Sequence, residues 1–141
     1  MVIDAISNGI VLDHIKPGLS MELYSILGLD RMECSVAVLK NVPSRKMGRK
    51  DIIKIDEIID IDFDVLGYVD PDITVNIVRN GQLDRKFSIG LPERVTNVIK
   101  CRNPRCITST EQELPHIFKL ADRERRIYRC LYCESRAKGE S

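Results

Sequence analysis

The fold of this chain is decided by the stretch Ile73-Thr-Val-Asn-Ile-Val-Arg79-Asn80-Gly81-Gln82-Leu-Asp-Arg-Lys-Phe-Ser88. Two runs of strand-forming residues flank Asn80-Gly81 within it. An Asn-Gly pair between two such runs is the strongest local signal for a β-hairpin, because a type I′ turn needs positive φ at both turn positions. The stretch therefore predicts two antiparallel strands, residues 73–79 and 82–88.

The residues before this hairpin predict further strands and two helices. Alternation over residues 2–6, followed by Ile10-Val11-Leu12, indicates one long or bent strand. An amphipathic helix ending near Gly28 is predicted next, from apolar residues spaced i, i+4, i+7 and i+8: Leu19, Leu23, Ile26 and Leu27. We expect two more strands at 35–40 and 51–56, separated by a basic loop at 43–50, and a short helix at 62–69.

This order of elements, strand-helix-strand-strand-helix-strand-strand, is typical of an α+β fold. We expect a ferredoxin-like antiparallel sheet with helices on one face. The core must rest on Ile, Val and Leu, because only 5% of the residues are aromatic and none is Trp.

Charge and cysteine content divide the chain of 141 residues into two domains. The whole sequence has 22 basic and 21 acidic residues, but residues 1–93 have a formal charge of −4 and residues 94–141 one of +5. Four of the five cysteines also lie in the second part. Pro92 marks a plausible joint, since proline cannot extend a strand ladder. We expect one domain over 1–93 and a small all-β domain over 94–141.

The four cysteines of the second part predict a zinc site. They form two close pairs, Cys101-x4-Cys106 and Cys130-x2-Cys133, and four thiolates suit tetrahedral zinc. A segment this short rarely folds on a hydrophobic core alone, so we expect one structural zinc ion per chain. The alternatives are two disulfides or four unrelated buried thiols. Cys34 lies in a strand-like stretch and is expected to be a small buried hydrophobic residue.

No catalytic motif is present in the sequence. There is no Gly-rich phosphate loop and no nucleophile with an evident base, and His116 is expected to lie at the surface. His14 follows the first strand, and Lys54 and Lys86 lie in predicted strands, so the three can converge on a polyanion such as a triphosphate. The alternative for such lysines is plain exposure to solvent.

The sequence also indicates a location and a rival function. The longest apolar run is Val36 to Leu39, and the start lacks a signal-peptide pattern, so we expect a cytoplasmic protein with no membrane partner. Zinc ribbons often bind nucleic acid, which makes a nucleic-acid-binding protein with an N-terminal dimerisation domain the alternative. Four thiolates and Zn²⁺ would reduce the +5 of the second part to about +3, which is modest for that role, so no nucleic-acid partner is expected.

Several longer strings resemble one known family, the regulatory chain of aspartate carbamoyltransferase. The resemblance runs from about residue 2 to 134 and includes the cysteine spacing. The other strings that carry it are Asp4-Ala-Ile6, Gly9-x-Val-x-Asp-His-Ile15, Met47-Gly-Arg-Lys-Asp-x-Ile-Lys-Ile55, Thr74-Val-Asn76, Leu91-Pro-Glu-Arg94 and Asn97-Val98.

The resemblance implies a non-catalytic allosteric subunit of pyrimidine biosynthesis. Family members pair through their N-terminal domains, dock their zinc domains on a catalytic chain, and bind nucleoside triphosphates: CTP inhibits, UTP can assist it, and ATP activates. In the zinc domain, Asn103 and Glu134 match positions that face the catalytic chain.

The resemblance also implies a nucleotide site. The positions that match base, ribose and apolar-wall contacts are Ile3, Asp4, Ala5, Ile6, Val11, Asp13, Lys54, Asn76, Val78 and Leu83. His14 and Lys86 match phosphate-binding positions, and Gly81 stands where better-known relatives carry a larger residue.

Overall fold

The computed structural model describes residues 6–137 of the chain. The chain divides into two compact units, Met1–Gly90 and Leu91–Ser141. The elements of the first unit are β1 (Gly9–Ile15), α1 (Ser20–Ile26), the 3-10 helix η1 (Leu29–Arg31), β2 (Val36–Ser44), β3 (Gly48–Ile55), α2 (Phe63–Val69), β4 (Thr74–Arg79) and β5 (Gln82–Ser88).

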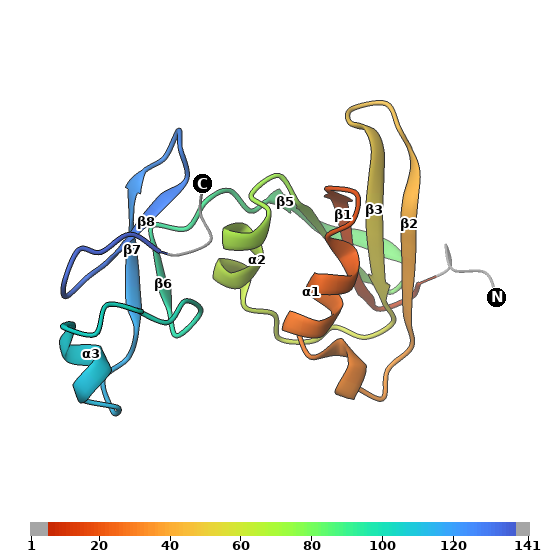
Figure 1. The fold of residues 1–141 in the computed structure, drawn as a ribbon. Helices are drawn as coiled ribbons and strands as arrows, with labels where there is room; N and C mark the ends of the chain where they lie inside the picture. Colours follow the sequence, from red (N-terminus) through yellow and green to blue (C-terminus); the bar gives the residue numbers. More distant parts are fainter. Residues whose placement is uncertain (1–5, 138–141) are drawn as a thin grey trace. The chain divides into compact units, whose positions relative to one another are not determined.

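The first unit is a five-stranded antiparallel sheet with the strand order β2-β3-β1-β4-β5. Both helices pack on the same face of this sheet (Figure 1). The predicted α+β, ferredoxin-like architecture is confirmed, and so is the hairpin: Asn80 and Gly81 have φ angles of 52° and 75°, as a type I′ turn requires.

One face of the sheet forms the core of this unit. Successive residues of a strand point to opposite faces, so alternate positions of β1, β3 and β4 meet the helices. These positions are Ile10, Leu12, Ile53, Ile55, Val75 and Ile77. Leu23 of α1 and Leu66 of α2 are fully buried against them.

The predicted basic loop at 43–50 is wrong. Strands β2 and β3 continue through most of it and pair as far as Ser44 opposite Gly48. The connection is a tight turn over residues 45–47. Gly48 has a φ of 80°, which glycine adopts without strain, so the chain can reverse at once. The charged residues of this segment lie on an exposed hairpin. Charged side chains occur both in exposed strands and in loops, so they do not distinguish the two.

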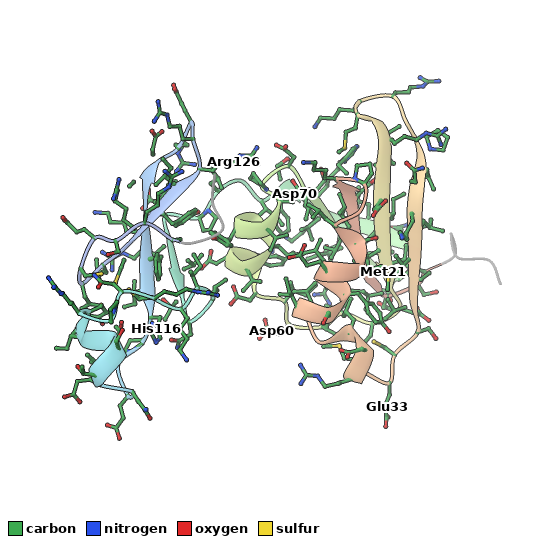
Figure 2. All side chains as sticks on the ribbon, viewed as in Figure 1. Met21, Glu33, Asp60, Asp70, His116 and Arg126 are labelled. Atoms are coloured by element: carbon green, nitrogen blue, oxygen red, sulfur yellow. The ribbon has the colours of Figure 1, made fainter. Side chains whose placement is uncertain are left out.

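A buried carboxylate ties the loops of the first unit to its sheet. Asp51 of β3 is fully buried, and its Oδ2 accepts hydrogen bonds from the hydroxyl of Ser20 at 2.6 Å and from the N–H of Gly18 at 3.0 Å. Its Oδ1 accepts from the N–H of Asn41 at 2.7 Å. Asp70, at the end of α2 (Figure 2), similarly accepts from the N–H of Lys16 at 2.9 Å. The bonds from Lys16 and Gly18 satisfy backbone N–H groups of the turn that leads into α1.

The second unit is a three-stranded antiparallel sheet, β6 (Arg94–Thr96), β7 (Ile117–Asp122) and β8 (Ile127–Cys130), in the order β6-β7-β8. Phe118 and Tyr128 are buried on one face, and the hydroxyl of Tyr128 donates to the carbonyl of Pro92 at 2.6 Å. One short helical turn, α3 (Ile107–Thr110), follows Cys106 and was not predicted. None of the helices within residues 6–137 has the length and apolar composition needed to cross a bilayer.

The Asp51 carboxylate makes a testable contribution to stability. Burial by itself raises the pKa of this carboxyl, but the hydroxyl of Ser20 and three backbone N–H groups donate to it and hold the pKa below its ordinary value. The stabilisation is therefore present above the unfolded pKa of about 3.9 and is lost as the pH falls through the lower folded value.

We expect Asp51→Asn to lower the free energy of unfolding of the first unit by about 2–4 kcal/mol at neutral pH, because it removes the charge that three or more donors share. The deficit should shrink as the pH falls below about 4. Chemical denaturation at both pH values measures this. The control Asp60→Asn, at an exposed position, should change stability by less than about 0.5 kcal/mol. An equal deficit at both pH values would contradict the role of the charge.

Candidate metal centre and candidate ligand face

Four cysteine sulfurs of the second unit gather at one point. The Sγ atoms of Cys101, Cys106, Cys130 and Cys133 all lie within 4.8 Å of one another. Two of the separations are 3.6 Å, between Cys101 and Cys133, and 3.7 Å, between Cys106 and Cys130. A tetrahedron with Zn–S bonds of about 2.3 Å has edges of about 3.8 Å, whereas a disulfide bond is about 2.05 Å long. The sulfurs therefore fit one metal ion and form no disulfides.

Hydrogen-bond donors surround these sulfurs as they do in thiolate sites. The hydroxyl of Thr108, in a buried residue of α3, donates to Cys106 Sγ at 3.1 Å. The backbone N–H of Asn103 donates to Cys101, and the N–H and hydroxyl of Ser135 donate to Cys133. Such donors favour the charged thiolate over the neutral thiol, and they hold each sulfur in position.

Without a metal, the thiols of Cys101 and Cys133 have very different pKa values. Burial raises the pKa of Cys101 to about 12. Burial also acts to raise the pKa of Cys133, but the donors from Ser135 and the neighbouring thiols lower it to about 6. A metal must displace the protons of the other thiols, so its affinity falls as the pH falls. All four cysteines would hold the ion, which leaves no open coordination position and makes the zinc structural.

His116 is not the free surface residue that we expected. Its side chain is half-buried, and its Nδ1 accepts a hydrogen bond from the N–H of Cys101 at 3.1 Å. Its own N–H donates to Asn97 Oδ1 at 2.9 Å. His116 (Figure 2) thus orients the first metal-ligand loop, a long-range contact that its sequence neighbours do not reveal. Cys34 is half-buried and packs against the core of the first unit.

A row of four side chains crosses the face of the five-stranded sheet that the helices leave open. Val11 of β1 is directly opposite Lys54 of β3 on one side and Asn76 of β4 on the other. Asn76 is in turn opposite Lys86 of β5. Directly opposed residues point to the same face, so the register brings together four positions that are far apart in sequence. We call this side of the sheet the ligand face.

A cavity of about 430 Å³ lies on the ligand face. Seven of its lining residues are candidate site residues: Ile6, Val11, Asp13, Lys54, Asn76, Val78 and Leu83. Ile52 also lines it and was not predicted, although its position two residues before Lys54 in β3 places it on the same face. Gly81 lines it too, and a Cβ atom added there would meet no atom within 4 Å.

Asp13, which lines this cavity, forms an ion pair with Lys50. Asp13 Oδ1 lies 3.0 Å from Lys50 Nζ, and both side chains are about one-fifth exposed: 23% for Asp13 and 18% for Lys50. Burial acts to raise the pKa of Asp13, but the hydrogen bonds from Lys50 and from the backbone N–H of His14 outweigh it and lower the pKa. Asp13 therefore presents a charged acceptor to the cavity at neutral pH.

His14 and Lys86 do not line the cavity. His14 lies at a register shift in β1, has a φ of 58°, and its Nδ1 is 3.1 Å from Thr74 Oγ1. Lys86 is exposed, one strand beyond Asn76. These two candidates for phosphate contacts thus lie outside the cavity lining, whereas Lys54 is part of it. The remaining candidates, Ile3, Asp4 and Ala5, lie outside the described residues.

The metal centre predicts the effect of one substitution. Cys130→Ser should abolish zinc binding and unfold the second unit while the first stays folded, because structural sites of this kind supply about 10–16 kcal/mol of apparent binding energy. Metal content and amide NMR spectra of both units measure this. Cys34→Ser is the matched control and should keep one zinc per chain. A Cys130→Ser chain that retained a full equivalent of zinc would rule out the four-sulfur site.

Comparison with known proteins gives the same assignment for both units. The family described as aspartate carbamoyltransferase regulatory chain, allosteric domain, matches residues 1–90. The family described as the metal binding domain of the same chain matches residues 93–141.

Individual relatives match along almost their whole length. An aspartate carbamoyltransferase regulatory chain of Clostridium tetani is 49% identical over 135 residues, which cover 95% of this chain and 94% of the relative. The one of Clostridium acetobutylicum is 47% identical over 139 residues, 99% and 95% of the two chains. That of Bifidobacterium longum is 42% identical over 138 residues, 98% and 99% of the two chains. The chain therefore belongs to the family of aspartate carbamoyltransferase regulatory chains, which are regulatory rather than catalytic, and its four cysteines form the metal centre of the second domain.

Proposed function

We propose that the ligand face binds nucleoside triphosphates and that their binding regulates a catalytic chain. The observation that carries the proposal is the register of the sheet, which aligns Lys54, Val11, Asn76 and Lys86 beside a cavity of about 430 Å³. Such a cavity is within the usual size range for a small-molecule site. It combines apolar walls with a few convergent polar groups, which is the composition that a nucleotide needs.

Most groups on or beside the ligand face have a distinct chemical role in this proposal. The Asn76 amide supplies donors and an acceptor for a base or sugar, and the Asp13 carboxylate accepts from a ribose hydroxyl. Val11, Val78 and Leu83 contact the flat faces of base and sugar. Lys86 and His14, at the side of the cavity, contact the triphosphate, which extends out of the pocket toward solvent.

The effectors in this proposal are CTP and UTP as inhibitors and ATP as activator. Purine and pyrimidine must make different contacts in two states of the complex, since a ligand with equal affinity for both states shifts nothing. A coupling free energy of about 1–3 kcal/mol changes an affinity by roughly 5- to 150-fold. The open space beside Gly81 accommodates bases of either size, because no Cβ fills it.

The assembly that transmits this signal is also part of the proposal. The first domain, about residues 1–93, forms a homodimer, and the zinc domain, about 94–141, docks on the catalytic chain. Zinc keeps the docking surface in one conformation, because both cysteine pairs and the strand β8 are held at the same ion. The complex then acts in pyrimidine biosynthesis in the cytoplasm.

The phosphate contact can be tested with one pair of variants. Lys86→Ala should weaken CTP and ATP binding by about tenfold or more and leave cytidine and adenosine binding nearly unchanged, because a charge-assisted bond to phosphate is lost. Isothermal titration calorimetry measures both. The control is Arg85→Ala, which removes the same charge from the neighbouring residue, whose guanidinium lies 5.0 Å from the Phe87 ring centroid. Equal losses for nucleotide and nucleoside would contradict the proposed role of Lys86.

A further inference from the structure

Four cationic residues lie in one line across the sheet of the second domain. Arg94 of β6 is directly opposite Lys119 of β7, and Lys119 is opposite Arg129 of β8. An isolated bridge then pairs Arg129 with Arg136. We call these four residues the basic row. They are separated by up to 42 positions in sequence, so only the register of the sheet brings them together.

The basic row lies on the outer face of this sheet. All four residues are exposed, whereas their strand neighbours Val95, Phe118 and Tyr128 are buried on the other face. Adjacent strands are about 4.8 Å apart, so the row extends over about 14 Å. It therefore presents a straight line of positive charge at nearly regular spacing.

The row brings like charges together across neighbouring strands. Like charges directly opposite each other on a sheet are unfavourable, and here three successive cross-strand pairs are alike in sign. Among residues 6–137, none of the four forms an ion pair. The nearby acidic Asp122 instead pairs with Arg125 at the β7–β8 turn, at 4.0 Å.

A shallow hollow adjoins the row. It has a volume of about 410 Å³, and its lining includes Lys119 and Arg129 of the row, the apolar Leu131 and one acidic residue, Glu134, whose backbone carbonyl accepts a hydrogen bond from Arg129. Leu131 is 38% exposed. Positive charge beside an exposed apolar side chain is the composition of a protein interface, in which a buried contact is surrounded by a charged rim.

We propose that the basic row is a docking surface for an acidic patch of the catalytic chain, with carboxylates spaced about 5 Å apart. This inference rests on the proposed assembly with a catalytic chain, and it names the surface that makes the contact. Charge complementarity steers two such surfaces together and sets their register. Because Cys130 directly follows Arg129, the zinc ion holds one strand of the row in place.

A protein partner fits the row better than nucleic acid does. Non-specific binding to nucleic acid depends on neutralising many phosphates, and the row offers four cations. Single strands also need aromatic platforms on which bases stack. In the described part of the second domain, Phe118 and Tyr128 are buried and Tyr132 is 40% exposed, so the outer face offers no series of stacked rings.

The test compares two double variants that lose the same charges. Arg94→Gln/Lys119→Gln removes half of the row, and Arg45→Gln/Lys46→Gln removes one Arg and one Lys from the exposed β2–β3 turn of the first domain. The affinity of the full-length chain for purified catalytic chain is measured by sedimentation at about 50 mM and about 200 mM salt. Metal content and CTP affinity are measured for each variant as folding checks.

We expect the row variant to bind the catalytic chain at least tenfold more weakly at low salt and to depend less on salt, since fewer ions are displaced on binding. The turn variant should stay within twofold of the unmodified chain. Lys119→Arg keeps the charge and should keep the affinity, which separates lost charge from lost structure.

Two results would overturn the inference while the proposed function stands. The first is a row variant that keeps its zinc and binds the catalytic chain with unchanged affinity and salt dependence. The second is a row variant that loses affinity only for a short DNA duplex and not for the catalytic chain. Failure of the unmodified chain to assemble with any catalytic chain would instead overturn both proposals.

Discussion

The five-stranded sheet of the first domain is covered by helices on one face only, and the rest of that domain depends on this constraint. Because side chains alternate along a strand, each strand must divide its residues between a dry face and an open one. Ile10 and Leu12 are buried under the helices, and Val11 between them lies on the open face with Lys54 and Asn76. The same alternation that builds the core therefore also places the candidate ligand groups.

The second domain is limited by the small size of its hydrophobic core. Its sheet has three short strands and buries few large side chains, so the metal centre must supply what a small core cannot. The sulfurs of Cys101 and Cys133 meet although they are 32 positions apart, and donors such as the Thr108 hydroxyl stabilise the charged form. The rigidity that the ion provides reaches β8, which carries a member of the basic row. Structural metal and candidate docking surface are thus parts of one arrangement.

Predictions from the sequence were most accurate where the signal was local. The Asn80-Gly81 hairpin, the α+β sheet and the four-cysteine centre all follow from short spacings, and the structure agrees with each. The segment 43–50 was misassigned because charged residues on an exposed hairpin are chemically the same as those in a loop. His116 was misjudged for another reason: its partner is the backbone of Cys101, and no pattern of residue types encodes that contact.

The sequence by itself determined the family, the position of the metal ligands and the type of fold, because each depends on residue identity and spacing along the chain. Tertiary structure alone decided which distant side chains become neighbours. The line of Lys54, Val11, Asn76 and Lys86 exists only through strand register, as does the basic row around Lys119. A shift of one residue in any pairing would turn a whole strand over, and the register is fixed only when the apolar positions of all the strands pack together against one core.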